Sequence, residues 1–341
     1  MEQQGQQDCA SAREDAILFV TSYYRRDWDL VRIHSSPREH APVRDSIQTP
    51  FSRSFSISLG ALSRLPPELL LAVLRELDVL STFRFRQVNS LARSVVSDWQ
   101  PYRALATHAL EAFRAILRTG LAPRFAINDI YRLLHTSNEC VACSHFSPLL
   151  FLPTLQRCCF RYLRDAPRFR VMSLHALAKA SKSPASELRK SLAVVHTVPG
   201  YYSAHDRLRN KRIRLVSVAN MRSNLANVNF SLPRDKRPSD IEEVIRCMVA
   251  TAFPRLDREL DGVEARVSCI GCQVAVENDP GDGRLRDQLY LRDRCYTVEG
   301  FLEHFESCPE AQALWSASCD GTATVEVPAL KESGGFLNVK E

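Results

Sequence analysis

Apolar positions in this 341-residue chain repeat at helical spacing from residue 62 onward and show little order before it. Between residues 62 and 99, leucines and valines recur every three or four positions in three short runs, which predicts three short helices. Pro66 and Pro67 stand where the first helix would begin, and proline is tolerated in a first helical turn. Three helices in so short a stretch bury little apolar surface, so we expect them to pack against a partner or the rest of the chain.

The helical spacing continues with interruptions toward the C-terminus. It predicts helices over residues 105–120, 127–134 and 239–250, and a helical stretch over 171–198 that is broken at Pro184. Residues 212–218 alternate between apolar and polar positions, as a strand does. The pattern predicts a mainly α fold with small β elements, that is, an α+β chain dominated by helices.

Composition and pattern together divide the chain into five parts. Residues 1–58 are rich in Gln, Ser and Arg and lack a period, so we expect a mostly disordered leader with one short helix near residues 16–24. The later parts are the three-helix unit at 59–105, a helical region with a cysteine-rich insert at 106–200, a C-terminal module at 201–318 and a loose tail at 319–341.

Two cysteines and a distant histidine–cysteine pair form the clearest chemical motif. Cys269 and Cys272 make a CxxC turn that contains a glycine, and His304 and Cys308 are four residues apart, so both would lie on one side of a helix. Tetrahedral zinc takes such Cys₃His sets, and a closed set is structural. We expect a module that does not fold without its metal.

The intervening segment is expected to form a hairpin, with residues 281–283 as the turn and residues 288–292 as a strand. Cys295 is a spare candidate ligand. The alternative is that Cys269 and Cys272 are buried thiols and that His304 is a surface residue.

A second cysteine group contains Cys140, Cys143, Cys158 and Cys159. Its spacing is also compatible with zinc, although adjacent cysteines bind one metal only with some backbone strain. His135 and His145 are nearby candidates to complete it. The alternative is a cysteine-rich apolar core, because free cysteine is often buried.

Several classes of function are not favoured by the sequence. No apolar run approaches the roughly 20 residues of a membrane-spanning helix, and the first residues lack a secretory pattern, so no membrane partner is expected. No phosphate-binding glycine loop, nucleophile elbow or metalloprotease motif is present, so we expect no enzyme activity. The odd count of 11 cysteines favours the reducing cytoplasm or nucleus.

Nucleic acid is a weaker possibility. The net charge of +6 is only mildly basic, and the basic run at 205–214 is as typical of a solvated loop as of a phosphate-binding one.

The three-helix unit resembles the F-box, a module that docks on the Skp adaptor of SCF ubiquitin ligases. The shared order is Leu62-x-x-Leu65-Pro66-x-Glu68-Leu69-Leu70, then Val73, Leu74, Leu77, Asp78, Leu80, Phe83, Phe85, Arg86, Val88 and Leu91. The resemblance implies that eight of these residues are core or adaptor-contact positions, two roles that the sequence does not separate. They are Leu62, Leu65, Pro66, Leu69, Leu70, Leu74, Leu77 and Val88.

The resemblance extends to most of residues 62–315, whose order of motifs is similar to a filamentous-fungal family of F-box proteins with a cysteine-rich C-terminal region. The motifs are LRTGLAPRF, CxxC, LFLPTLxRCCF, RVxSLxAxAK, RLVSV, CxGC, LYxRDRxY and FLEHFxxCxxAQxLW. The family pattern implies a cysteine where Tyr162 stands, so the fourth ligand of the second group is left open.

The resemblance implies a receptor that holds an unidentified protein substrate near a cullin-RING ligase and makes no bond itself. The alternative is a zinc-stabilised nucleic-acid-binding or transcription-associated protein whose F-box-like helices are simply core.

Overall fold

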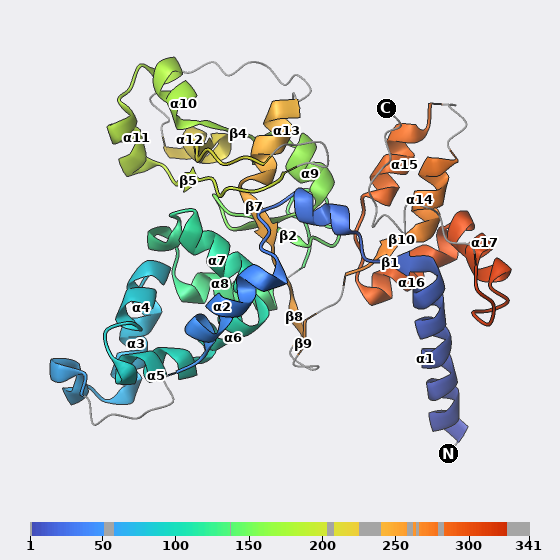
Figure 1. Ribbon diagram of the computed structural model, residues 1–341, viewed down its shortest axis with the longest axis horizontal. Coiled ribbons are helices and arrows are strands. Elements are labelled where there is room, and N and C mark those ends of the chain that lie inside the picture. The colour runs from blue at the N-terminus through green and yellow to red at the C-terminus, as the bar shows by residue number, and fades with distance from the viewer. Residues whose placement is uncertain are drawn as a thin grey trace.

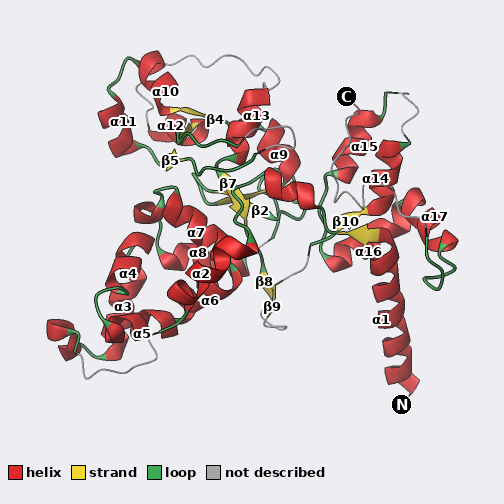
Figure 2. Cartoon of the chain, in the orientation of Figure 1, coloured by secondary structure: helices red, strands yellow, loops and turns green. Residues whose placement is uncertain are grey.

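The computed structural model describes residues 2–50, 58–136, 138–202, 208–224, 240–257, 262–263, 266–278 and 283–325. Helices dominate this part of the chain, and the strands form four sheets of two or three strands each (Figure 2). The predicted mainly α fold with small β elements is therefore confirmed. None of the described helices is both long and apolar enough to cross a bilayer.

The three-helix unit has the helices that its periodicity predicts. They are α3 (Pro67–Glu76), α4 (Val79–Phe85) and α5 (Ser90–Asp98). Pro67 opens α3, and the Asp78 side chain accepts a hydrogen bond from the Ser81 backbone N–H at the start of α4. Asn89 caps α5 in the same way through the N–H of Ala92. Each short helix therefore has a local stop or start signal that fixes its ends.

The next helices form the largest apolar core. They are α6 (Gln100–His108), α7 (Leu110–Arg118) and α8 (Ile127–His135). The single helix predicted over 105–120 is divided at Ala109, whose φ of −125° leaves the helical region. Leu105, Phe113 and Ile116 are nonetheless all fully buried, since the two pieces share one core. Gly120, with φ +78°, ends the second piece.

Two three-stranded antiparallel sheets lie beyond these helices. The first has the order β3-β2-β7, from β2 (Leu149–Phe151), β3 (Gln156–Cys158) and β7 (Ala250–Ala252). The second has the order β4-β6-β5, from β4 (Val171–Ser173), β5 (Val194–His196) and β6 (Arg214–Ser217). Helices α9 (Phe160–Asp165), α10 (Leu174–Ser181), α11 (Ala185–Ser191), α12 (Val218–Asn224) and α13 (Asp240–Cys247) connect or cover them. The predicted strand at 212–218 is β6, whereas the predicted helical stretch at 171–198 begins and ends as a strand.

The C-terminal module is helical where a hairpin was expected. It contains β10 (Ser268–Cys269), α14 (Ile270–Glu277), α15 (Leu285–Arg292), α16 (Val298–Ser307) and α17 (Pro309–Ala317). A small pair, β8 (Leu256–Asp257) and β9 (Gly262–Val263), precedes it. The strand predicted at 288–292 is wrong, because its Leu, Gln and Arg residues are better helix than strand formers. Of the predicted turn, only Gly283 is within the described residues.

The expectation of a mostly disordered leader is wrong for residues 2–50. Helix α1 (Glu2–Thr21) packs against α16 and α17, and β1 (Ser22–Tyr23) pairs with β10. Helix α2 (Pro37–Gln48) packs against α6. Trp28, Ile33 and Ile47 are 4%, 2% and 3% exposed, so this segment contributes to the core. Its apolar residues show no regular period because they pack against several different helices and strands. Residues 51–57 and the tail from 326 lie outside the described part.

Residues 22–35, which we call the N-terminal strap, connect the two ends of the molecule. In Figure 1 the blue strap runs from the C-terminal module across the middle of the protein toward α2. The backbone N–H of Ile33 donates to the carbonyl oxygen of Ala250, the first residue of β7, at 2.7 Å. Arg32 and His34 meet Glu111 of α7 at 2.6 and 3.1 Å, and the N–H of Ser35 donates to the same carboxylate at 3.1 Å. Glu111 therefore attaches the strap to the helical core.

The Glu111 carboxylate carries a testable share of the stability. Burial raises its pKa, but the hydrogen bond from His34 and the charge of Arg32 outweigh burial and lower the pKa from 4.5 to about 2. A lowered pKa means that the folded state holds the carboxylate ionised, so the stability is complete above about pH 4.5 and is lost as the pH falls toward 2. We expect Glu111→Gln to cost about 3 kcal/mol at pH 7.

Chemical denaturation of wild type and variant at pH 7 and pH 3 measures this cost. The difference between the two proteins should fall to less than half at pH 3. Glu303→Gln, on the exposed face of α16, removes the same charge and should change little at either pH. An equal cost for Glu111→Gln at both pH values would contradict the ionic role of Glu111.

Candidate metal centres and partner-binding surface

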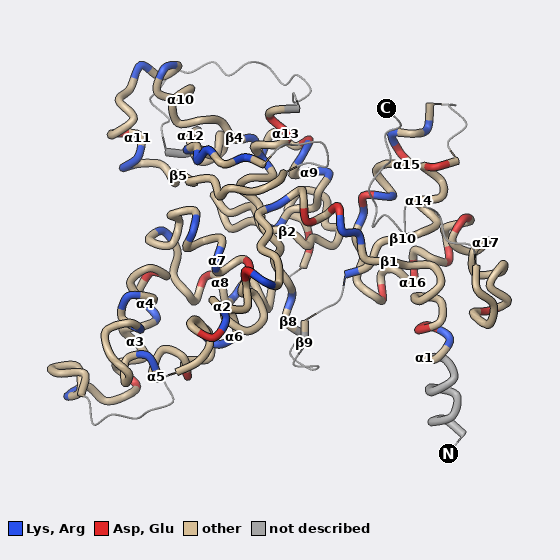
Figure 3. The backbone as a smooth tube through the Cα atoms, in the orientation of Figure 1, with Lys and Arg blue, Asp and Glu red and all other residues tan. Residues whose placement is uncertain are grey.

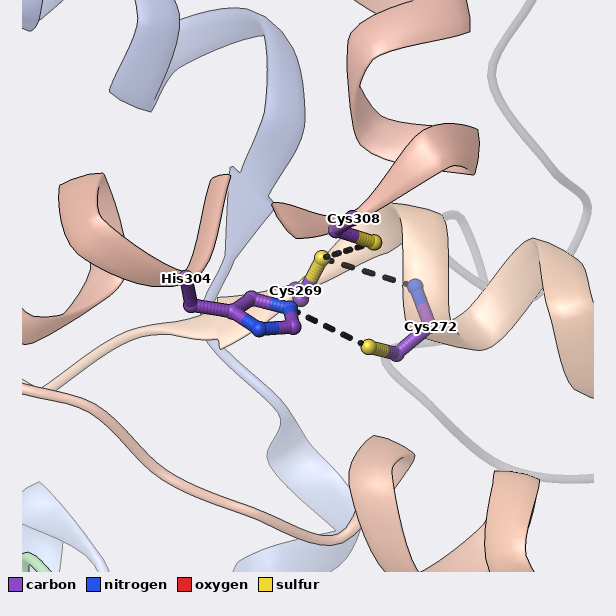
Figure 4. A group of neighbouring side chains, drawn as sticks. All are labelled: Cys269, Cys272, His304 and Cys308. Atoms are coloured by element: carbon purple, nitrogen blue, oxygen red, sulfur yellow. Dashed lines mark hydrogen bonds between the residues drawn. The ribbon is translucent and has the colours of Figure 1, made fainter. Parts of the chain in front are cut away.

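The four residues of the Cys269 group come together from three helices. Cys269 is the N-cap of α14 and Cys272 lies in its first turn, while His304 lies in the last turn of α16 and Cys308 lies between α16 and α17. Their ligand atoms all lie within 4.8 Å of one another (Figure 4). The three cysteines are buried and His304 is half-buried. The structure thus brings together the full set that the spacing predicts.

The donor atoms of this group have the separations that a tetrahedral ion needs. The Sγ atoms of Cys269 and Cys308 lie 3.8 Å apart, and Cys272 Sγ lies 3.3 Å from His304 Nε2. Four ligands at zinc bond lengths of 2.0–2.3 Å stand about 3.3–3.8 Å from one another. Cys269 Sγ also accepts a hydrogen bond from the Cys272 N–H at 3.4 Å, which holds the sulfur over the turn. The residues present therefore fit a closed zinc site.

Packing around the group orients its ligands in the folded module. The Tyr296 ring stacks on the His304 ring at 4.6 Å and 18°, which sets the plane of the imidazole. Gly271 sits against α17 so closely that a Cβ there would lie 2.3 Å from the Ala311 backbone nitrogen. Only glycine therefore allows the CxxC turn to approach Cys308.

The cysteine thiols of this group differ in their pKa values. Hydrogen bonds from Cys269 and Cys272 hold the pKa of Cys308 well below its usual range. The Cys272 thiol has a raised pKa because it hydrogen-bonds to the neighbouring sulfurs and is buried. A bound zinc ion would take all three cysteines as thiolates, so protons and metal compete for the site.

The second group contains three of its four predicted cysteines. Cys140, Cys143 and Cys159 have ligand atoms within 4.8 Å of one another, and the Sγ atoms of Cys143 and Cys159 lie 3.8 Å apart. Hydrogen bonding to Cys159 lowers the pKa of Cys140 to about 5. This group too has the donor set and spacing for a metal.

Cys158 as a ligand is a wrong prediction. It lies on β3 opposite Leu149, is fully buried and packs in the main core. Successive strand residues point to opposite faces, so Cys158 and Cys159 cannot both face the turn at Cys140. Cys295 is likewise buried in the main core rather than among the Cys269 group.

The eight candidate positions of the three-helix unit differ in their burial. Leu70 and Leu74 are buried and Leu77 packs on the core, so these three hold the unit together. Leu65 is half-buried and Pro66 is exposed. Leu62, Leu69 and Val88 are 38%, 53% and 68% exposed.

Two further apolar side chains on the same helices are exposed. They are Val73, one turn after Leu69 on α3, and Leu91 at the start of α5. Helical spacing places Val73 on the same side of α3 as Leu69, so the sequence could have added it to the candidate contact positions. No sequence signal distinguishes exposed from buried positions in a unit this short.

Comparison with known proteins finds an F-box domain at residues 62–104. The match covers α3, α4, α5 and the first half of α6. No curated protein and no solved structure matches the chain. At the family level, an F-box supports a role as an adaptor or substrate receptor in an SCF-type ligase, bound to the Skp adaptor and a cullin-RING ligase, and such proteins are generally non-enzymatic.

Removal of metal from the Cys269 group should unfold the C-terminal module. Structural zinc is worth about 10–16 kcal/mol in zinc-finger peptides, as much as the whole stability of a typical domain. We expect Cys308→Ser to lose one zinc equivalent and to expose Trp315, which packs with Cys269 and Cys272. Zinc should also leave wild type as the pH falls, because protons displace it from the thiolates.

Zinc analysis and tryptophan fluorescence of the full chain measure both effects. Cys319→Ser is the matched control, since Cys319 is an exposed free thiol just after α17. Full zinc content and unchanged fluorescence in Cys308→Ser would rule out this site.

Proposed function

We propose that this chain is a substrate-receptor subunit of an SCF-type ubiquitin ligase. Its F-box at residues 62–104 docks on the Skp adaptor, and residues 106–318 present a surface for a protein substrate. The observation that carries the proposal is the exposed apolar surface of the F-box. Four side chains on it, those of Leu69, Val73, Val88 and Leu91, are between 37% and 68% exposed.

Exposed leucines and valines on short helices need a partner. Contiguous apolar surface on a folded protein marks an interaction site, and helices that present such residues bind in the grooves of partner proteins. Leu69 and Val73 are four residues apart on α3, so they share one side of that helix. The buried residues Leu70 and Leu74 lie on the adjacent face of the helix, which packs against the core. The docking surface is thus independent of the residues that fold the unit.

The receptor would act by placing its substrate, not by chemistry. Holding a target and a ubiquitin-loaded enzyme in one complex turns their encounter into an intramolecular event at high effective concentration. In this proposal, zinc in the Cys269 group is structural: it fixes α14, α16 and α17, and all four of its coordination positions are taken by the protein. We place the protein in the reducing cytoplasm or nucleus, where its thiols stay free to bind metal.

A double substitution on the exposed surface tests the proposal. We expect Leu69→Ala with Val88→Ala to weaken adaptor binding at least tenfold, since these side chains would each be buried in the interface at about 1–2 kcal/mol. The fold should be unaffected because neither side chain is in the core. Co-purification of the full chain with the Skp adaptor, followed by titration calorimetry, measures the loss.

The matched control removes equal apolar surface elsewhere. Leu291 and Val298 in the C-terminal module are 40% and 37% exposed, and replacing both with alanine should leave adaptor binding unchanged. A monodisperse wild-type chain that ignores the adaptor would refute the receptor hypothesis. Salt-dependent binding to nucleic acid by that same chain would then favour the zinc-stabilised nucleic-acid-binding alternative.

A further inference from the structure

We propose that Cys140, Cys143 and Cys159 form a second zinc centre and that His145 supplies its fourth ligand. The centre lies outside the F-box and outside the C-terminal module, and it does not depend on the ligase role proposed above. Its ligands come from the turn after α8 and from the first residue before α9.

The turn that carries Cys140 and Cys143 is held by its own backbone. The N–H groups of Cys143 and Ser144 donate to the carbonyl oxygen of Cys140 at 3.3 and 2.9 Å, and the N–H of Ala142 donates to Cys140 Sγ at 3.4 Å. Ser144, with φ +58°, reverses the chain. A further hydrogen bond, from the Val141 N–H to the carbonyl oxygen of Arg157 at 3.2 Å, connects the turn to β3. In the Cys269–Cys272 turn the first sulfur also accepts a backbone N–H, there from the second cysteine of the turn rather than from the residue before it.

The sulfur atoms stand at metal-binding separation. Cys143 Sγ and Cys159 Sγ are 3.8 Å apart, and all three cysteines are free thiols whose sulfurs lie within 4.8 Å. Two thiolates bound to one zinc at 2.3 Å stand about 3.8 Å apart in a tetrahedron. Soft thiolate ligands select zinc over the harder divalent ions. Three sulfurs alone leave one tetrahedral position, so a fourth donor is needed to close the site.

His145 is placed to be that donor. The Cys140 N–H donates to the His145 carbonyl oxygen at 2.7 Å, so the backbone of His145 is fixed beside the first ligand. Its Nδ1 atom is buried and has no hydrogen-bond partner among the residues that the structure describes. His145 and Cys159 line the same small pocket, and the imidazole ring would turn within it to bring a nitrogen to the three sulfurs, which alone lie within 4.8 Å of one another. The other candidate, His135, is on α8 with its ring against Tyr131 at 4.6 Å.

The charge of the surroundings favours this assignment. Zinc with three thiolates and one neutral imidazole carries a net charge of −1. Two cations, Arg161 and Arg294, line the same pocket as His145 and Cys159 and would offset that charge. Desolvated anionic sites are stable only with such compensation.

The location suggests what the metal would stabilise. Trp28 of the N-terminal strap, Phe160 of α9 and Tyr290 of α15 also line this pocket, so three distant segments meet at the centre. Arg161, two residues after Cys159, lies over the Tyr290 ring at 3.8 Å. A metal at Cys159 would fix the start of α9 and, through Arg161, the contact of the central region with the C-terminal module.

Zinc stoichiometry of the full chain tests the centre. We expect two zinc ions per wild-type chain, one per chain after Cys143→Ser or Cys159→Ser, and still two after Cys158→Ala. The last variant is the sharpest control, because Cys158 is adjacent to Cys159 but points into the core. The Cys308→Ser variant should lose the other ion only, which separates the two centres. A single zinc in wild type, or equal losses in Cys158→Ala and Cys159→Ser, would overturn the proposal.

Cobalt substitution tests the fourth ligand, and the variant His145→Cys keeps a metal-binding side chain at that position so that the fold is retained. In wild type, the sulfur-to-cobalt charge-transfer intensity should correspond to three thiolates at each of two tetrahedral ions. His145→Cys should retain both ions and raise the total from six thiolates to seven, whereas His145→Ala should weaken one ion at least tenfold. His135→Ala should do neither. Unchanged affinity in His145→Ala, or an unchanged thiolate total in His145→Cys, would show that another donor closes the site.

Discussion

The structure depends on two buried arginines, Arg25 and Arg292, that are far apart in the sequence. They meet where the N-terminal strap contacts the end of α15. They are 4% and 5% exposed, and they share the carboxylates of Asp27 and Asp293. Arg25 also donates to the carbonyl oxygen of Arg292 at 2.9 Å. Buried charges persist only when every one is paired, so this network forces the N-terminal strap and the end of α15 into a single register.

Because one end of the strap is fixed in this way, its remaining contacts link the C-terminal module to the opposite end of the molecule. Beyond Arg25, the strap adds a backbone hydrogen bond to Ala250 of β7 and ion pairs to Glu111 on α7, and α2 then packs on α6. In Figure 3 the strap carries acidic and basic segments close together where it passes between the two halves. Figure 1 places α3, α4 and α5 at one end of the protein and α14–α17 at the other. For a receptor, this arrangement would set the spacing between the adaptor and the surface that holds a substrate.

Local chemistry in this chain is predictable from sequence wherever neighbours along the chain decide the outcome. The F-box helices begin at Pro67, Asp78 and Asn89, signals that act within one turn. The Cys269 group was recognisable because CxxC and HxxxC spacings each bring two ligands together locally. The error at 288–292 has the converse cause: a stretch of only five residues shows too little of its period to separate strand from helix, and the helix preference of its Leu, Gln and Arg residues was outweighed.

The sequence by itself determined the helical class, the start of the first F-box helix and which residue types could hold a metal, since these follow from period, the position of proline and spacing. The tertiary structure alone decided which of two adjacent residues faces which environment. It buries Leu70 and exposes Leu69, and it sends Cys158 into the core and Cys159 toward Cys140. It also ordered residues 11–50, whose scattered apolar side chains pack against elements far along the chain: α2 lies on α6, and β1 pairs with β10, where Ser22 stands opposite Cys269. The physical reason is that burial and charge pairing are properties of surfaces in contact, and those surfaces do not exist until distant segments have packed.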